Sequence, residues 1–379
     1  MSEYQYYEFV AVDRPLTPAQ QGELRALSTR ARITASSFVN DYQWGNLKGD
    51  PRAWMERYFD AHLYLANWGT RRIALRLPRS LLDPDTAATY CVGESAHSWA
   101  TREHVILDLS TEDEDGDEEW WDSEGSLASI VPVRAELAAG DLRLLYLAWL
   151  LCVQGRELDE DEPEPPVPPG LGELSGPLRS LADFLRLDQD LVAVAAQASS
   201  ARTAKTPSAA ALTKWVKSLP QADKDAAIVR LLRGEDVHLR TELILRYNGG
   251  RDPEAAGGGR TVGELLAGAE TRWAHRQRLA KERQAAGRAR REQAAAAARE
   301  QRLNTLAADQ DQAWQRVSAM IDTKKPKEYD AAVGLLADLK TLSERDRQTA
   351  TFVRRVRLLR QEHARKPSLL DRLDRAGLG

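Results

Sequence analysis

The sequence predicts a multidomain protein, in which an N-terminal mixed α/β (α+β) domain precedes an all-α region. Apolar residues alternate with polar ones in several segments before residue 154, which is typical of half-buried strands. Beyond residue 178 the apolar residues recur at helical spacing. The run from Val262 to Ile321 contains no proline and only three glycines, which predicts one long helix.

The first half of the N-terminal domain predicts the order strand, helix, strand, helix. Residues 4–12 are rich in aromatic and β-branched side chains, and residues 33–42 form a second such segment. Residues 17–20, Thr-Pro-Ala-Gln, combine a threonine cap with proline at the first helical position. The Asp-Pro pair at 50–51 repeats this signal, and we expect the helix after it to carry four residues at helical spacing: Trp54, Tyr58, His62 and Leu65.

The second half of this domain predicts further strands and a closing helix. Residues 71–78 and 105–109 alternate apolar and polar side chains, residues 130–133 are a further strand candidate, and residues 141–153 predict a buried helix. This order indicates a layered α/β fold, with a ferredoxin-like arrangement as one candidate.

The domain boundaries follow from changes in composition. Residues 154–177 are acidic and contain six prolines, which predicts a stiff, extended linker. A cluster of glycines before residue 261 predicts a flexible joint. We therefore expect the following parts: an α/β domain with an aromatic core (1–154), the acidic linker (155–177), a small helical bundle (178–248), the glycine-rich joint (249–261), the long basic helix (262–321), a helical hairpin (326–366) and a tail (367–379).

Composition limits the possible classes of function. Residues 1–176 hold 31 acidic and 15 basic residues, whereas residues 177–379 hold 26 acidic and 38 basic residues. This charge split indicates two surfaces with different partners, or with each other as partners. The two cysteines provide no disulfide framework and no thiolate cluster, so neither a cofactor nor a metal is expected. The N-terminus has no signal-peptide pattern and the longest apolar run is too short for a bilayer, so the sequence predicts a cytoplasmic protein without a membrane partner.

The basic segment of the long helix is the first candidate interaction site. From Arg272 to Arg302 the chain carries ten Lys and Arg residues against three acids, and it has no large apolar residue between Leu279 and Leu303. A conventional coiled-coil seam is therefore missing there, which leaves a solvated spacer or partner helix, an alanine-lined pairing seam, a nucleic-acid contact, or a dock for the chain's own acidic segments. The candidate phosphate-binding residues recur on one helical face: Arg276, Arg283, Arg290 and Arg291.

An acidic loop with tandem tryptophans is the second candidate. Residues 112–119 hold seven carboxylates, and Trp120 and Trp121 follow them. A calcium loop is disfavoured, because Glu118 occupies the position that requires glycine. The two indoles either anchor a protein partner or pack back onto the sheet, and Tyr329 and Phe352 of the hairpin are expected as further anchors.

One cluster of residues permits an enzyme hypothesis. Cys91, His97, His104 and Asp108 lie close in sequence, and cysteine–histidine catalysis requires such groups within hydrogen-bond reach. No known local signature surrounds Cys91. The favoured prediction is therefore a non-enzymatic interaction or scaffold protein with a protein partner. The alternatives are a nucleic-acid-associated accessory protein that uses the basic helix, and an uncatalogued enzyme that uses the Cys–His cluster.

Overall fold

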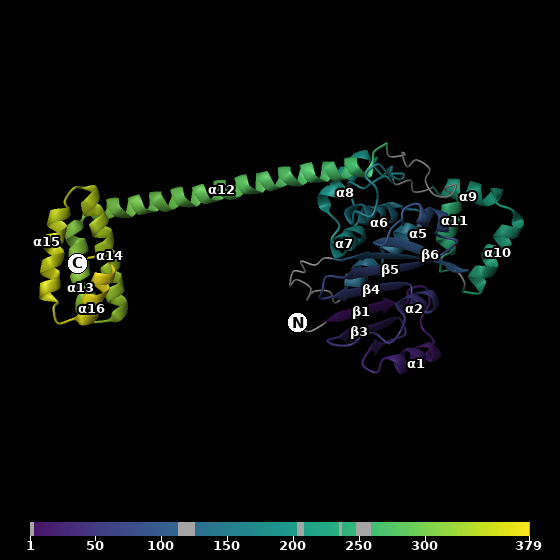
Figure 1. Ribbon diagram of the computed structural model, residues 1–379, viewed down its shortest axis with the longest axis horizontal. Helices are drawn as coiled ribbons and strands as arrows, with labels where there is room; N and C mark the ends of the chain where they lie inside the picture. The colour runs from purple at the N-terminus through teal and green to yellow at the C-terminus, as the bar shows by residue number, and fades with distance from the viewer. Residues whose placement is uncertain (1–3, 113–125, 203–207, 235–236, 248–258, 379) are drawn as a thin grey trace. The chain divides into compact units, whose positions relative to one another are not determined.

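The computed structural model (Figure 1) describes most of the chain, namely residues 4–112, 126–202, 208–234, 237–247 and 259–378. The chain divides into two compact units, Met1–His275 and Arg276–Gly379. Each hydrophobic core consists of residues from one unit alone.

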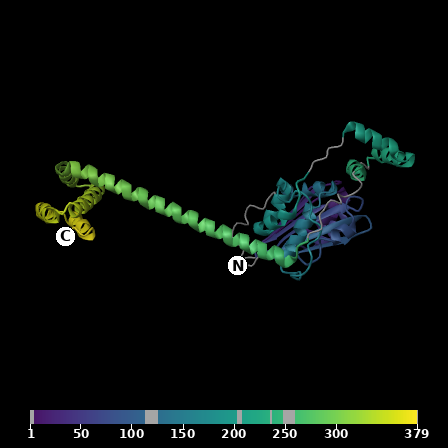
Figure 2. The ribbon, with the colours of Figure 1, turned by 90° about the horizontal axis from the view of Figure 1, so that it is seen from above.

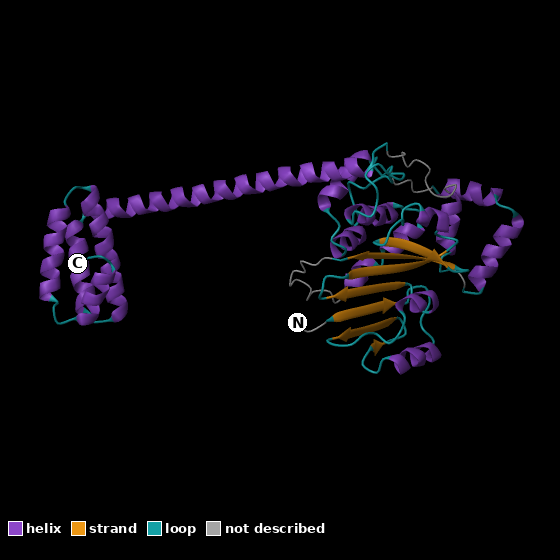
Figure 3. Ribbon diagram, viewed as in Figure 1, coloured by secondary structure: helices purple, strands orange, loops and turns teal. Residues whose placement is uncertain are grey.

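The first unit is built on a seven-stranded antiparallel sheet, shown in orange in Figure 3. The strand order is β2-β3-β1-β4-β5-β7-β6. Successive side chains of each strand point to opposite faces, so each face receives every second residue. The strands are β1 (Gln5–Val10), β2 (Arg32–Ile33), β3 (Ser37–Tyr42), β4 (Ala61–Ala66), β5 (Arg71–Pro78), β6 (Ala96–Ala100) and β7 (His104–Thr111).

Helices α1 (Pro18–Leu27) and α2 (Pro51–Arg57) pack against one face of the sheet. Both begin at the cap-and-proline signals that the sequence predicts. Leu24 of α1 and Trp54 of α2 share an aromatic cluster with Phe9 and other sheet residues. The predicted aromatic core is therefore present on this face.

The opposite face is covered by helices from the second half of the unit. Residues Arg143–Val153 of α6 (Arg143–Gln154) are all buried, as expected for the most apolar run of the chain. None of the described helices combines the length and the hydropathy needed to cross a membrane. The remaining helices between β5 and residue 200 are α3 (Pro84–Ala88), α4 (Ser126–Ile130), α5 (Val133–Ala138), α6 (Arg143–Gln154), α7 (Gly176–Phe184), α8 (Gln189–Ala195) and the 3₁₀ turn η2 (Ala196–Ala198).

Two element predictions are wrong. His62 and Leu65 lie on strand β4 rather than on a helix, because α2 ends at Arg57 and the chain turns at Tyr58. Leu65 faces the large core and His62 faces the aromatic cluster, which is the alternation of a strand. Residues 130–133 form no strand, because Ile130 is the last residue of α4 and Val133 is the first residue of α5.

The acidic, proline-rich segment is packed, so the prediction of an extended linker there is also wrong. Val167 and Leu171 are buried in the large core, and the Glu164 side chain is fully buried. Pro163 forms an isolated β-bridge with Thr261, just before the long helix α12 (Val262–Ala308). The segment therefore belongs to the first unit and closes over its core.

The helices after the acidic segment, in the region predicted as a small bundle (178–248), do not form one bundle. α7 and α8 pack on the large core, whereas α9 (Ala209–Ser218) and α10 (Gln221–Leu232) contain no buried residue. Figures 1 and 2 show α9 and α10 standing off from the sheet and its covering helices. Helix α11 (Leu239–Tyr247) returns to the core, where Leu245 packs. Most of the predicted glycine-rich joint lies outside the described residues.

The long helix ends earlier than predicted. α12 spans Val262–Ala308, and Asp309 then breaks the helix and caps α13 by accepting a hydrogen bond from the backbone of Gln312. α12 ends and α13 begins within the core of the second unit, to which Leu303 and Val317 both contribute.

The second unit is a helical assembly. The predicted hairpin corresponds to the pair α14 and α15, and residues 367–375 form a further helix where only a tail is expected. All these helices share one core, to which the last helix contributes Leu369 and Leu373. The helices after α12 are α13 (Gln310–Asp322), α14 (Pro326–Arg345), α15 (Thr349–Glu362) and α16 (Pro367–Arg375).

Candidate interaction surfaces

His97 and Asp108 are brought together on neighbouring strands. They are opposite each other in the register of β6 and β7, with 3.7 Å between His97 Nε2 and Asp108 Oδ2. Arg72 of β5 donates hydrogen bonds to both carboxylate oxygens of Asp108, one of them at 2.6 Å, and these bonds raise the pKa of the guanidinium. The carboxylate is thus engaged by an arginine that the sequence analysis did not identify.

Cys91 and His104 lie away from this pair. Cys91 packs against the core on the opposite face of the sheet, where burial raises the pKa of its thiol to about 12. His104 is four residues from Asp108 along β7, about 13 Å at the rise of a strand. Because a thiolate nucleophile needs its base within hydrogen-bond reach, the predicted Cys–His site does not assemble. Among the described residues, no group of three or more His, Cys, Asp or Glu side chains is arranged to hold a metal ion.

A row of polar side chains crosses five strands of the same face. Its hydroxyl groups are tied together, because Tyr7 and Tyr64 both donate to Gln5 Oε1, at 2.8 and 3.1 Å. Burial raises the pKa of both tyrosines, so their hydroxyls remain neutral donors. Sequence analysis missed this row because its members become neighbours only through the strand register. The row consists of Asn40, Tyr7, Tyr64, Arg72 and Ser110.

The exposed stretch of α12 is the most extensive candidate surface. Between Ala269 and Leu303 no residue of the helix is buried. At 3.6 residues per turn, a spacing of seven residues moves along the helix by about 10 Å and around it by only about 20°. Arg276, Arg283 and Arg290 therefore form a narrow stripe of exposed side chains.

The charges around this stripe are segregated. Arg291 lies at the edge of the stripe, about 80° from the centre of the line formed by Arg276, Arg283 and Arg290. The acidic residues of this stretch are turned away from the centre of that line by about 100° or more, at the helical rotation per residue. These acidic residues are Glu282, Glu292 and Glu300. We refer to Arg276, Arg283, Arg290 and Arg291 as the arginine stripe.

Trp273 is an exposed residue of α12 that sequence analysis missed. Its side chain is 51% exposed in the part of α12 that belongs to the first unit. The signal was present, since Trp273 is the single aromatic residue between Tyr247 and Trp314 in the sequence. Exposed tryptophan is enriched at binding sites, so Trp273 is a candidate contact residue.

The predicted partner anchors of the hairpin are not accessible. Tyr329 and Phe352 are each only 7% exposed, because both belong to the core of the second unit. Their prediction as anchors is wrong: helical spacing identifies an apolar face, and this face is used internally. The other two predicted anchors, Trp120 and Trp121, lie outside the described residues, as do most residues of the acidic loop.

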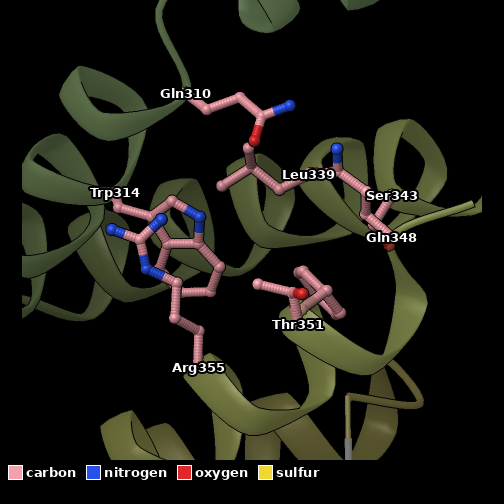
Figure 4. A pocket seen from close by; sticks show the side chains of 8 residues that line it. Gln310, Trp314, Leu339, Ser343, Gln348, Thr351 and Arg355 are labelled. Carbon is pink, nitrogen blue, oxygen red and sulfur yellow. The ribbon is translucent and has the colours of Figure 1, made fainter. Parts of the chain in front are cut away.

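A small pocket lies between α13, α14 and α15 (Figure 4). Arg355 stacks over the Trp314 ring at 5.0 Å and pairs with Asp311 at 2.9 Å. The cavity measures about 30 Å³, far below the roughly 300–1,000 Å³ of typical ligand-binding sites. The pocket is therefore too small for an organic ligand.

A second exposed surface is apolar. In α10, Ile228 and Leu231 are each 55% exposed and Leu232 is 81% exposed. Val216 of α9 is also exposed. Clustered exposed apolar side chains are typical of protein–protein contact sites. Arg230 of α10 pairs with Glu242 of α11 at 2.6 Å, within the same unit.

The chain matches no protein-family model, no curated protein and no solved structure.

Proposed function

We propose that the protein is a non-enzymatic interaction protein that contacts a protein partner through the exposed stretch of α12 and the second unit. The observation that carries this proposal is the absence of any buried side chain over residues 270–302 of α12. A helix of this length that buries nothing adds little to the stability of either core, because most helical stability comes from packing. Its length then serves to present side chains to a partner.

The apolar surface of α10 gives independent support for a protein partner. α9 and α10 bury none of their residues, although both carry large apolar side chains. Short helices are marginal in water unless an apolar face is covered. A protein partner that covers Ile228, Leu231 and Leu232 would supply this packing.

The arginine stripe favours a second candidate, a nucleic-acid-associated accessory protein. Guanidinium groups at intervals of about 10 Å along one face can make several contacts with the phosphates of a nucleic-acid backbone. Because the acidic residues of this stretch are turned away from that face, they repel a polyanion bound there less strongly. Such binding would be independent of base sequence and would weaken steeply with salt.

Two variants of equal charge test both candidates. The stripe variant replaces four arginines by glutamine: Arg276, Arg283, Arg290 and Arg291. The matched control replaces four basic residues on the other side of α12: Arg278, Lys281, Arg288 and Arg299.

The first measurement is fluorescence anisotropy of the full chain with labelled single-stranded DNA, duplex DNA and RNA, at low and moderate salt. Salt-sensitive binding that weakens at least about tenfold in the stripe variant, but much less in the control, supports the nucleic-acid candidate. Absence of binding at low salt rejects it. Affinity capture with the same variants then tests the protein partner: a partner held equally by all three proteins contradicts a role of the stripe.

We also propose a ferredoxin-like arrangement for the first part of the sheet. The elements from β1 to β4 follow the order βαββαβ, and their strands lie in the order β2-β3-β1-β4. α1 and α2 both pack in the aromatic cluster on one face, which supports the proposal. Strands β5, β7 and β6 then extend that sheet beyond β4.

A cytoplasmic location is proposed from the cysteines. Cys91 and Cys152 both carry free thiols, which is the usual state in a reducing compartment. Fractionation of cells followed by immunodetection tests this location.

A further inference from the structure

A groove runs along the outer surface of the second unit between α15 and α16. It encloses about 410 Å³, within the range of sites that bind ligands. One apolar side chain, Leu370, comes from α16, and the other lining residues come from α15 and the turn after it. The lining residues are Val353, Arg357, Arg360, Gln361, Ala364 and Leu370.

The spacing of the groove residues is that of a helix-docking seam. Val353, Arg357 and Arg360 follow one another at intervals of four and three residues, so they form one line along the axis of α15, and Ala364 extends the lining into the turn after the helix. The line from Val353 to Arg360 is about 10 Å long, or two helical turns. The core side chains of α15, such as Val356, are turned away from it by about 60° or more. The seam is thus separate from the face that α15 buries.

The seam is apolar at its ends and cationic at its centre. Val353 is 41% exposed at one end, and Ala364 is exposed at the other. At the centre, Arg360 is paired with Asp374 at 2.7 Å. Arg357 is exposed and forms no ion pair with the described residues. No acidic residue lines the groove, so it offers one available positive charge between two apolar contacts.

We propose that this groove binds an amphipathic helix of a protein partner whose apolar stripe is interrupted by carboxylates. Apolar side chains of the partner pack on Val353, Ala364 and Leu370, and a carboxylate pairs with Arg357. This is the helix-in-groove mode of recognition, in which anchors recur at intervals of three and four residues. The inference deepens the proposed protein interaction and rests on it, because it assigns the chemistry of the partner.

A nucleic-acid ligand fits this groove less well. Phosphate contacts reward several cationic groups in a row, and here one of the two arginines is already neutralised by Asp374. Val353 and Leu370 would bury no apolar surface against a phosphodiester backbone. The charge and the apolar surface of the groove together therefore favour an acidic helix of a protein over a nucleic acid.

The test uses the full chain and a fluorescein-labelled helical peptide rich in alanine, in which two leucines flank two glutamates at the heptad spacing of the groove. The peptide with lysines in place of the glutamates is the comparison probe. Arg357→Glu removes the cationic centre. Arg354→Glu is the matched control, because Arg354 is also exposed on α15, is absent from the groove lining and forms no ion pair with the described residues.

We expect the glutamate peptide to bind the unmodified protein and the Arg354→Glu variant with affinities within about twofold. Arg357→Glu should weaken binding of the glutamate peptide about tenfold. The same variant should bind the lysine peptide more tightly than the unmodified protein does, which an unfolded variant cannot do. Equal binding of the glutamate peptide by both variants overturns the groove assignment, as does absence of binding. Displacement of the peptide by duplex DNA, with a matching loss of DNA affinity in Arg357→Glu, also overturns it. None of these outcomes decides the proposed function, which is tested separately on the arginine stripe.

Discussion

Arg260 donates hydrogen bonds to both carboxylate oxygens of Glu164, at 2.9 and 2.6 Å, although the two residues are 96 positions apart. Tyr146 also donates its hydroxyl proton to Glu164, whose side chain is fully buried. Arg260 further donates to the backbone carbonyls of Val194 and Ala195. This ion pair joins the acidic segment to the residues that precede α12, and so fixes the start of the long helix on the first unit.

Glu164→Ala should lower the free energy of unfolding of the first unit by about 3 kcal/mol, because Arg260 and Tyr146 lose their shared partner in a buried site. Hydrogen exchange should also accelerate in residues 160–171 and at the start of α12. Urea unfolding monitored by circular dichroism, together with exchange mass spectrometry, measures both effects. Glu160→Ala is the control: its carboxylate is 80% exposed, and its removal should change stability by about 0.5 kcal/mol or less. Equal effects of the two substitutions would contradict the role of the Arg260 pair.

The same ion pair explains a failure of sequence-based prediction. Acidic residues and prolines are typical of extended linkers, and composition contains no information about an arginine that lies 96 residues later. Val167 and Leu171 are the local signal for packing, but two apolar residues among prolines do not form a period. Composition therefore identified the acidic, proline-rich segment, but whether it is extended or packed depends on tertiary contacts.

Other parts of the fold were predictable because their signals are local. The caps at Thr17 and Asp50 and the buried helix predicted over residues 141–153 depend on neighbouring residues. The structure confirms both caps and has this helix at Arg143–Gln154. The strand at His62 was mistaken for a helix because a short apolar run matches both periods. Candidate site residues were harder to predict, since the strand register that makes Arg72 and Asp108 diagonal neighbours is not encoded locally.

His62 makes the stability of the first unit sensitive to acid. Its ring stacks on Phe9 with centroids 3.8 Å apart, its Nδ1 is 3.0 Å from the Glu8 carbonyl oxygen, and burial lowers its pKa to about 4. The ordinary histidine pKa of about 6.5 applies to the unfolded chain. The unfolded state therefore binds the proton more readily, and stability falls as pH decreases from about 6.5 to about 4, by about 3 kcal/mol in all.

His62→Phe should flatten this dependence relative to the unmodified protein, even if it lowers stability at neutral pH. Urea unfolding of both proteins at a series of pH values from neutral to about 4 gives the comparison. A difference in unfolding free energy between the two that does not change with pH would show that His62 is not the responsible group.

Phe352 should be a structural residue of the second unit and not a partner anchor. Phe352 lies in the core and is only 7% exposed, and its ring centroid is 5.8 Å from that of Trp314. Phe352→Ala should therefore destabilise the second unit by about 3–5 kcal/mol, because it removes buried area and leaves a cavity. The neighbouring Val353→Ala should cost much less, since Val353 is 41% exposed.

Because the two units have separate cores, Phe352→Ala should leave unfolding of the first unit unchanged. Hydrogen exchange resolved by peptide distinguishes the units in one experiment. Loss of protection in the sheet of the first unit as well would show that the two cores unfold together.

The exposed stretch of α12 should depend on helix propensity alone. Ala294–Ala298 form five consecutive exposed alanines, and no side chain between Ala269 and Leu303 is buried. Replacing all five by glycine should cost about 1 kcal/mol per residue within the helix, or about 5 kcal/mol in total, without affecting either core. The helical circular dichroism signal should fall while the unfolding transitions of both units remain in place. The same five positions changed to glutamine keep helix-forming residues and should retain the signal. An undiminished signal in the glycine variant would mean that packing, rather than propensity, maintains this part of α12.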